Sequence, residues 1–141
     1  MKILALDLGD QWTGTALSDA LGILARPYQT VTTPLLIQFL EKIFKEEKIS
    51  TIVVGYPKTM QGNESQQTKT IVAMKESLEK QFPEKIWALW DERLTSKQAG
   101  SLQSNKGDKQ RIHSLAAALI LESYLMHVAY KRMCAQEQSE E

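Results

Sequence analysis

Acidic residues follow two apolar runs of this sequence, and a histidine stands at the start of a third. Asp7 follows ILAL, Asp91 and Glu92 follow IWALW, and His113 precedes SLAAALILESYL. Chemistry in open α/β sheets gathers at the carboxyl ends of parallel strands, so these acids are candidates for a shared site. Neighbouring residues of a strand point to opposite faces, so at most one of Asp91 and Glu92 should reach that site well. The imidazole of His113 could cap a helix, pack in the core or bind a metal.

The segment DLGDQWTG, residues 7–14, allows two interpretations. Its glycines could form a hairpin whose backbone N–H groups hold a nucleotide phosphate, with Asp7 holding the metal of that nucleotide. Alternatively, Asp7 belongs to a carboxylate cluster that cleaves phosphodiesters. Sugar-kinase and actin-like ATPases use a similar hairpin, but they place two such domains around the nucleotide. A chain of 141 residues has room for one, which disfavours the ATPase interpretation.

Hydrophobic patterning predicts the elements that must position these residues. Short apolar or β-branched runs predict strands at 3–6, 13–18, 22–32, 51–55 and 86–90. Helical spacing predicts helices after Pro34, after Asn63, from Thr95 and from His113, the last preceded by a polar loop at 101–112. The order β-β-β-α-β-α-β-α-α predicts an α/β fold with a mixed five-stranded sheet covered by helices.

Composition is that of an ordinary globular protein, with 43% hydrophobic and 24% charged residues. We expect one domain over 1–136 and an acidic tail over 137–141. Cys134 is the single cysteine, which excludes an intramolecular disulfide framework and a cysteine-rich zinc site. No run approaches the roughly 18 uninterrupted apolar residues of a membrane span. We therefore expect a cytoplasmic protein without membrane contact.

The charge is balanced overall but not along the chain. Seventeen basic residues stand against seventeen acidic ones, and three of the acids lie in the tail, which leaves residues 1–136 with a net charge of +3. Lys106, Lys109 and Arg111 gather in the predicted loop before His113. By charge pattern alone, a solvated loop is the preferred interpretation of this cluster, and a nucleic-acid contact is the alternative.

Four segments together resemble a known family. They are DLG-x4-G-x-A-x-SD at 7–19, VVGYPKTMQGNES at 53–65, WDERLTS at 90–96 and LAAALILESYL at 115–125. In order and spacing they resemble the YqgF family of pre-16S rRNA processing nucleases, long also named as Holliday junction resolvases. The resemblance runs from residue 1 to about 130, and it implies the ribonuclease H-like fold.

The resemblance also implies a metal-dependent nuclease that uses Mg²⁺ or Mn²⁺. Its acidic residues correspond to Asp7, to Glu92 (with Asp91 as the adjacent candidate) and to position 113. Many members carry an aspartate there, in a Lys-x-Asp-Ser context, whereas this chain has Arg-Ile-His-Ser. A neutral imidazole removes a negative charge and replaces a hard oxygen donor with nitrogen, which should shift preference from Mg²⁺ towards Mn²⁺. Alternatively, His113 and Ser114 only cap the helix, or the substitution marks lost catalysis.

The same resemblance favours nucleic-acid contacts. Arg93 is expected to pair with a phosphate or with the neighbouring acids, and Lys106, Lys109 and Arg111 are expected to hold the nucleic-acid backbone. The implied substrate is structured RNA, the 5′ end of pre-16S rRNA. Branched DNA is the alternative, and it would require a symmetric dimer; a non-catalytic rRNA-binding factor is another. The sequence leaves monomer and homodimer open.

Overall fold

The computed structural model describes residues 1–56, 66–91 and 109–140. Its elements are β1 (Lys2–Asp7), β2 (Trp12–Ser18), β3 (Ala25–Thr32), the 3-10 turn η1 (Thr33–Leu35), α1 (Leu36–Glu46), β4 (Ile49–Tyr56), α2 (Gln66–Gln81), β5 (Ile86–Asp91) and α4 (Lys109–Glu140). The strands form one sheet in the order β3-β2-β1-β4-β5. β1, β4 and β5 are parallel, whereas β2 pairs antiparallel with both β1 and β3. The predicted mixed five-stranded α/β sheet is confirmed.

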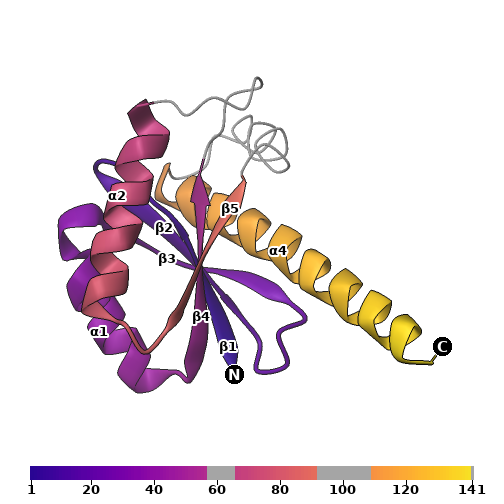
Figure 1. Cartoon of the computed structure of the whole chain (residues 1–141). Coiled ribbons are helices and arrows are strands. Elements are labelled where there is room, and N and C mark those ends of the chain that lie inside the picture. The colour runs from indigo at the N-terminus through magenta and orange to yellow at the C-terminus, as the bar shows by residue number, and fades with distance from the viewer. Residues whose placement is uncertain (57–65, 92–108, 141) are drawn as a thin grey trace.

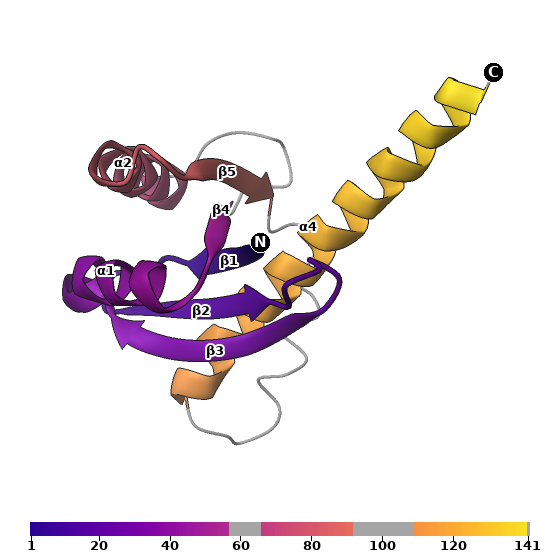
Figure 2. The same cartoon turned by 90° about the horizontal axis from the view of Figure 1, so that it is seen from below.

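The helices cover the two faces of this sheet unequally. α1 and α2 lie on one face and α4 crosses the other (Figures 1 and 2). β1 is buried on both sides, which explains its uninterrupted apolar run. Leu4 and Leu6 face α1 and α2, while Ala5 faces α4.

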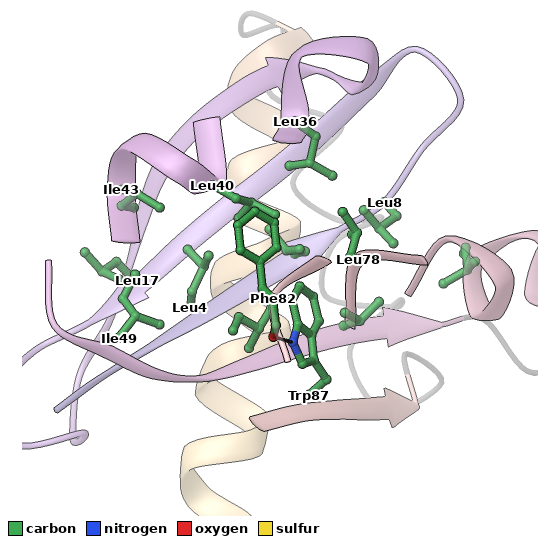
Figure 3. Packing of buried hydrophobic residues seen from close by; sticks show 14 residues of the cluster. Leu4, Leu8, Leu17, Leu36, Leu40, Ile43, Ile49, Leu78, Phe82 and Trp87 are labelled. Carbon is green, nitrogen blue, oxygen red and sulfur yellow. Dashed lines mark hydrogen bonds between the residues drawn. The ribbon is translucent and has the colours of Figure 1, made fainter. Parts of the chain in front are cut away.

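The core under α1 and α2 is built from large side chains (Figure 3). Leu40 and Ile43 of α1 and Leu78 of α2 are at most 5% exposed there. Trp87 of β5 joins this core, and its Nε1–H donates to the Phe82 carbonyl oxygen at 3.1 Å. This core of large side chains packs against the face of the sheet opposite to α4 and supports the parallel strands from that face.

The core under α4 is built from smaller side chains. Ala5, Ala16 and Val53 of the sheet contact Ala117 and Leu121 of the helix, and all five are fully buried. Small residues on both sides let the helix axis approach the sheet closely. The layer under α1 and α2 is therefore filled by large side chains, and the layer under α4 by smaller ones.

The structure corrects several predicted boundaries. α4 begins at Lys109, so the predicted loop at 101–112 is wrong over its last four residues. The helix continues through Glu140, so most of the predicted tail at 137–141 is helical. β3 begins at Ala25, three residues later than predicted. The predicted helix from Thr95 and the start of the helix after Asn63 lie outside the described residues.

α4 passes a length and composition test for a membrane span, although it contains no uninterrupted apolar run of about 18 residues. Within the described ranges, Arg111–Glu137 is long and apolar enough to cross a membrane by length and composition alone. Its first half packs on the sheet through Ala117, Ile120, Leu121 and Leu125. Burial of the core face in a folded domain accounts for the apolar character of that half.

Candidate active site

Asp7 is the last residue of β1 and lies on the face of the sheet that α4 covers. Side chains alternate along a strand, and Ala5 packs under α4, so the Asp7 side chain points to the same face. Its partner in the antiparallel ladder is Gly14 of β2. The parallel register that pairs Leu6 with Val54, continued by one residue, brings Gly55 of β4 to its other side. Asp7 is half-buried and lies between two positions without side chains.

Gly14 is the contact point between the sheet and the start of α4. A Cβ atom at this position would lie 2.0 Å from the carbonyl oxygen of His113 and 2.9 Å from the backbone nitrogen of Ser114. Only a residue without a Cβ permits this approach. Since Asp7 pairs with Gly14, the same contact places the backbone of His113 near the end of β1, on the face of the sheet to which Asp7 points.

His113 belongs to the sheet-facing side of α4. Positions 113, 117, 120 and 124 form an i, i+4, i+7, i+11 row on one helix face. Ala117 and Ile120 of this row are buried, and Tyr124 packs against Trp90. His113 itself is half-buried. The imidazole therefore lies on the face that the helix turns toward the strands.

His113 does not cap α4. The helix begins four residues earlier, and the hydroxyl of Ser114 donates to the Arg111 carbonyl oxygen at 3.0 Å, inside the helix. The capping part of the alternative in which His113, with Ser114, only caps the helix and packs is therefore wrong, whereas packing of His113 and Ser114 agrees with their burial. His113 lies in the second turn of α4, where its carbonyl oxygen packs on Gly14.

The carboxyl end of β5 is tied to α4 by Trp90. Its Nε1–H donates to the Ser123 hydroxyl at 3.1 Å, and its ring meets Tyr124 edge-on with centroids 5.6 Å apart. The ring of His127, an exposed residue, lies 5.1 Å from it. Because Trp90 faces α4, strand alternation directs Asp91 to the opposite face, away from the face of Asp7. Of the two adjacent acids, the geometry favours Glu92, which lies outside the described residues.

The turn that follows Asp7 is braced by Thr33. The Thr33 hydroxyl donates to the Gly9 carbonyl oxygen at 2.6 Å, and its backbone N–H donates to the Gln11 carbonyl oxygen at 2.9 Å. The hydroxyl of Thr13 lies 3.0 Å from that of Thr33. The sequence analysis missed this brace; a threonine beside Pro34 carries no signal of it.

Gly9 and Gly14 are both needed for close backbone contacts within the protein, which argues against their binding a nucleotide phosphate. The backbone of α4 covers Gly14, and a Cβ at Gly9 would lie 2.5 Å from the Trp12 carbonyl oxygen. A phosphate cannot approach a backbone that a helix already covers. The carboxylate interpretation of Asp7 is therefore the better supported of the two.

The structure places only part of the predicted nucleic-acid surface. Lys109 and Arg111 belong to the first turn of α4, and Arg111 is exposed. Arg93 and Lys106 lie outside the described residues. A hollow of about 440 Å³ lies beside the turn after β1, between Gly9, Asp10, Gln66 and Thr70.

The donor set fits a divalent cation in chemical type. Asp7 would supply carboxylate oxygens and His113 an imidazole nitrogen, which are both donor types that divalent metal ions bind. In the part of the chain that the structure describes, no three His, Cys, Asp or Glu side chains form a metal cluster. Glu92, the other predicted ligand, lies outside the described residues.

The chain is similar to known proteins over most of its length. A family model described as "RuvX: Holliday junction resolvase" matches residues 1–127. A protein of Rubrobacter xylanophilus is 39% identical over 127 residues, covering 88% of this chain and 91% of the relative. One of Christiangramia forsetii is 40% identical over 131 residues, covering 88% and 97%. Both are named "Putative pre-16S rRNA nuclease".

Solved structures of low sequence identity share the fold. Thermus thermophilus RuvC, solved with a Holliday junction substrate, has a TM-score of 0.56 and 15% identity, covering 94% of this chain and 96% of that one. The yeast mitochondrial Holliday junction resolvase Ydc2 has a TM-score of 0.54 and 11% identity, covering 95% and 83%. These similarities confirm the ribonuclease H-like fold, and the sequence matches confirm the resemblance to YqgF proteins. The chain belongs to the RuvX family.

Proposed function

We propose that this chain is a divalent-metal-dependent nuclease that hydrolyses phosphodiester bonds at the 5′ end of precursor 16S rRNA. One observation carries the proposal: the His113 carbonyl packs on Gly14, the ladder partner of Asp7. Through this backbone contact, the end of the strand that carries Asp7 lies close to the helix that carries His113, although the two residues are far apart in the sequence. Family membership supports the reaction, and the names of the relatives support the substrate.

Asp7, Glu92 and His113 would hold the ion. A bound divalent cation activates water for attack on phosphorus and stabilises the charge of the leaving oxygen. Asp7 supplies a hard oxygen donor, which suits both Mg²⁺ and Mn²⁺. His113 supplies nitrogen and removes one negative charge from the site, so we expect Mn²⁺ to be preferred.

Basic residues would position the substrate. Arg111, exposed on the first turn of α4, lies two residues before His113 and on the same helix. Arg93, Lys106 and Lys109 are proposed to hold phosphates of the same strand. Such contacts set the register of the nucleic acid without reading its sequence.

The test is a comparison of Mn²⁺ binding and cleavage in four proteins. Wild type, Asp7→Asn, His113→Asp and the control His127→Asp are titrated with Mn²⁺ and Mg²⁺ by calorimetry and then incubated with 5′-extended 16S rRNA. The control makes the same chemical change at an exposed histidine of the same helix. A four-way DNA junction is the second substrate.

The proposal expects Mn²⁺-dependent RNA cleavage that Asp7→Asn lowers at least 100-fold, by loss of a ligand. His113→Asp should shift the preference towards Mg²⁺, whereas His127→Asp, whose native ring contacts Trp90 and not the proposed ion, should keep the wild-type preference for Mn²⁺. Unchanged Mn²⁺ affinity in Asp7→Asn would contradict the metal site. Wild type that binds RNA but never cleaves it would instead support an rRNA-binding factor.

The second candidate is a Holliday junction endonuclease. The description of the matching family favours it. It predicts cleavage of the four-way junction in preference to the RNA by the same wild-type protein. The two functions share the proposed metal site but differ in the substrate that is cut, and the junction endonuclease also requires a symmetric dimer.

A further inference from the structure

The hollow of about 440 Å³ beside the candidate site lies between the turn that follows β1 and the first turns of α2. Leu8, which lines it, belongs to the buried cluster on the face of the sheet that α1 and α2 cover (Figure 3). Asp7 points to the opposite face, toward α4. The hollow and the candidate metal site therefore lie on either side of one strand end, where a single substrate can reach both.

The buried part of the lining is apolar. Leu8 and Ile71 are at most 4% exposed, and the half-buried Met74 adds a thioether to the same wall. Apolar side chains and a polarisable sulfur both suit contact with an aromatic ring. A ligand that fills this hollow should therefore have a flat, apolar face.

The exposed rim of the hollow is polar. It consists of Asp10 from the turn and of Gln66, Gln67 and Thr70 from α2. The Thr70 hydroxyl donates to the Gln66 carbonyl oxygen at 3.0 Å, so its own oxygen is left to accept. Of the described residues that line the hollow, Asp10 carries the only charged side chain, and a carboxylate only accepts hydrogen bonds. The rim therefore favours a ligand whose edge donates them.

The charge of Asp10 decides which part of a nucleic acid can enter. A phosphate would be repelled by this carboxylate, and no basic side chain stands among the described lining residues to offset the repulsion. A nucleobase has the required apolar face and hydrogen-bonding edge, and unpaired RNA bases are commonly recognised through both. Guanine alone among the four RNA bases has two neighbouring donors on its Watson–Crick edge, N1–H and N2–H. They match the two oxygens of one carboxylate.

We propose that this hollow binds an unpaired guanine of the RNA substrate. The Asp10 carboxylate accepts from N1–H and N2–H, and the ring lies against Leu8 and Met74. This assignment rests on the proposed function, since it takes the substrate to be RNA, and it adds a base preference to the same site. Asp10 is then a residue that determines specificity, without contact to the metal ion or to the phosphate that is cut.

The spacing of the two sites suits one continuous strand of RNA. Three peptide units separate Asp7 from Asp10, so their Cα atoms are at most about 11 Å apart. At roughly 3.4 Å per stacked nucleotide, the bound guanine lies only a few nucleotides from the phosphate at Asp7. The RNA must be unpaired at the guanine, because a paired base does not expose its Watson–Crick edge.

The test measures RNA binding without cleavage. Short oligouridines carry one central guanosine, adenosine, cytidine or inosine, and fluorescence anisotropy measures their affinities in the absence of divalent ions. The base of inosine lacks the 2-amino group of guanine, so it removes one of the two proposed hydrogen bonds. The proteins are wild type, Asp10→Asn, Thr70→Tyr, which narrows the hollow, and the control Glu76→Gln. The control changes a carboxylate to an amide at an exposed residue of α2 that does not line the hollow.

We expect wild type and Glu76→Gln to bind the guanosine oligonucleotide about 10-fold more tightly than the other three, as expected for a bidentate contact to a base. Asp10→Asn should bind all four alike, because its amide has one acceptor oxygen instead of two. Thr70→Tyr should also lose the preference, and circular dichroism confirms that each variant is folded. Equal affinities in wild type, or no binding at high micromolar concentration, would overturn the proposal. So would a guanine preference that survives in Asp10→Asn or in Thr70→Tyr.

The base site and the nuclease activity can fail separately. Since no divalent ion is present, a role of any residue in metal binding cannot produce the guanine preference. A wild type that prefers guanine but never cleaves RNA would support the base site and contradict the nuclease. Mn²⁺-dependent cleavage by a wild type without any guanine preference would support the nuclease and overturn the base site.

Discussion

Gly14 is the residue on which the candidate site depends most directly. It contributes no functional group, yet its missing side chain allows the backbone of α4 to approach β2. Asp7 and His113 are neighbours only because this approach is close. A glycine in a strand often marks such a contact with another backbone.

Replacing Gly14 by alanine should therefore displace the start of α4. The added Cβ would lie 2.0 Å from a backbone oxygen, which cannot move without the helix. We expect Gly14→Ala to lose about 3 kcal/mol of unfolding free energy, as overpacked cores do, and to lose Mn²⁺ affinity. Chemical denaturation and calorimetry measure the two effects.

Gly22→Ala is the matched control. A Cβ at Gly22 meets nothing within 4 Å, but the φ of 71° is strained for alanine. It should cost about 1 kcal/mol and leave Mn²⁺ affinity unchanged. Equal effects of the two substitutions on metal affinity would show that the α4 contact does not shape the site.

At the scale of elements, two contacts hold the site: α4 on β2 and β5 on α4. The second depends on Trp90, which lies two residues before Glu92 in the sequence. Its hydrogen bond to Ser123 and its edge-on contact with Tyr124 tie the end of β5 to the helix that carries His113. Trp90 thus acts as a positioning residue, with no contact to the reacting atoms in this proposal.

A double-mutant cycle of Trp90→Phe and Ser123→Ala measures this tie. Both single variants remove the same hydrogen bond, so their effects on unfolding free energy should overlap by about 1 kcal/mol. The Mn²⁺ affinity of Trp90→Phe should fall, because β5 is less firmly held. Additive effects on stability would show that the bond contributes nothing.

At the scale of the whole molecule, α4 joins two regions of different use. Its first half belongs to the core and the candidate site, and its second half projects away from the sheet (Figures 1 and 2). The two halves differ in burial, with Leu121 inaccessible and Met126 68% exposed. Stability should therefore depend on the first half more than on the second.

Shortening the chain separates these regions. A protein that ends at Tyr130 keeps every residue of α4 that is buried in the part of the chain that the structure describes, so its melting temperature and Mn²⁺ affinity should stay near those of the full chain. A protein that ends at Ile120 lacks Leu121 and Leu125 and should not fold, since each lost side chain costs about 2–5 kcal/mol. Loss of folding in the longer protein would contradict this division.

Much of the architecture was predictable because it depends on local pattern. The continuous apolar run of β1 and the helical spacing after Pro34 indicate how many faces of each element are buried. This pattern is contained in residues that are close together in the sequence. The same reasoning placed Asp7 at a strand end. It failed at the start of α4, because polar residues such as Lys109 begin a helix without any apolar period.

The sequence by itself determined the order of strands and helices along the chain, the apolar faces of these elements and the acids at the strand ends. Periodicity and residue type set these features over a few residues at a time. Only the tertiary structure decided that His113 lies beside Asp7, that Asp91 turns away and that Gly14 is a contact point. These features arise where segments far apart in the chain meet. Their distances depend on how closely backbones pack, and no short stretch of sequence contains that information.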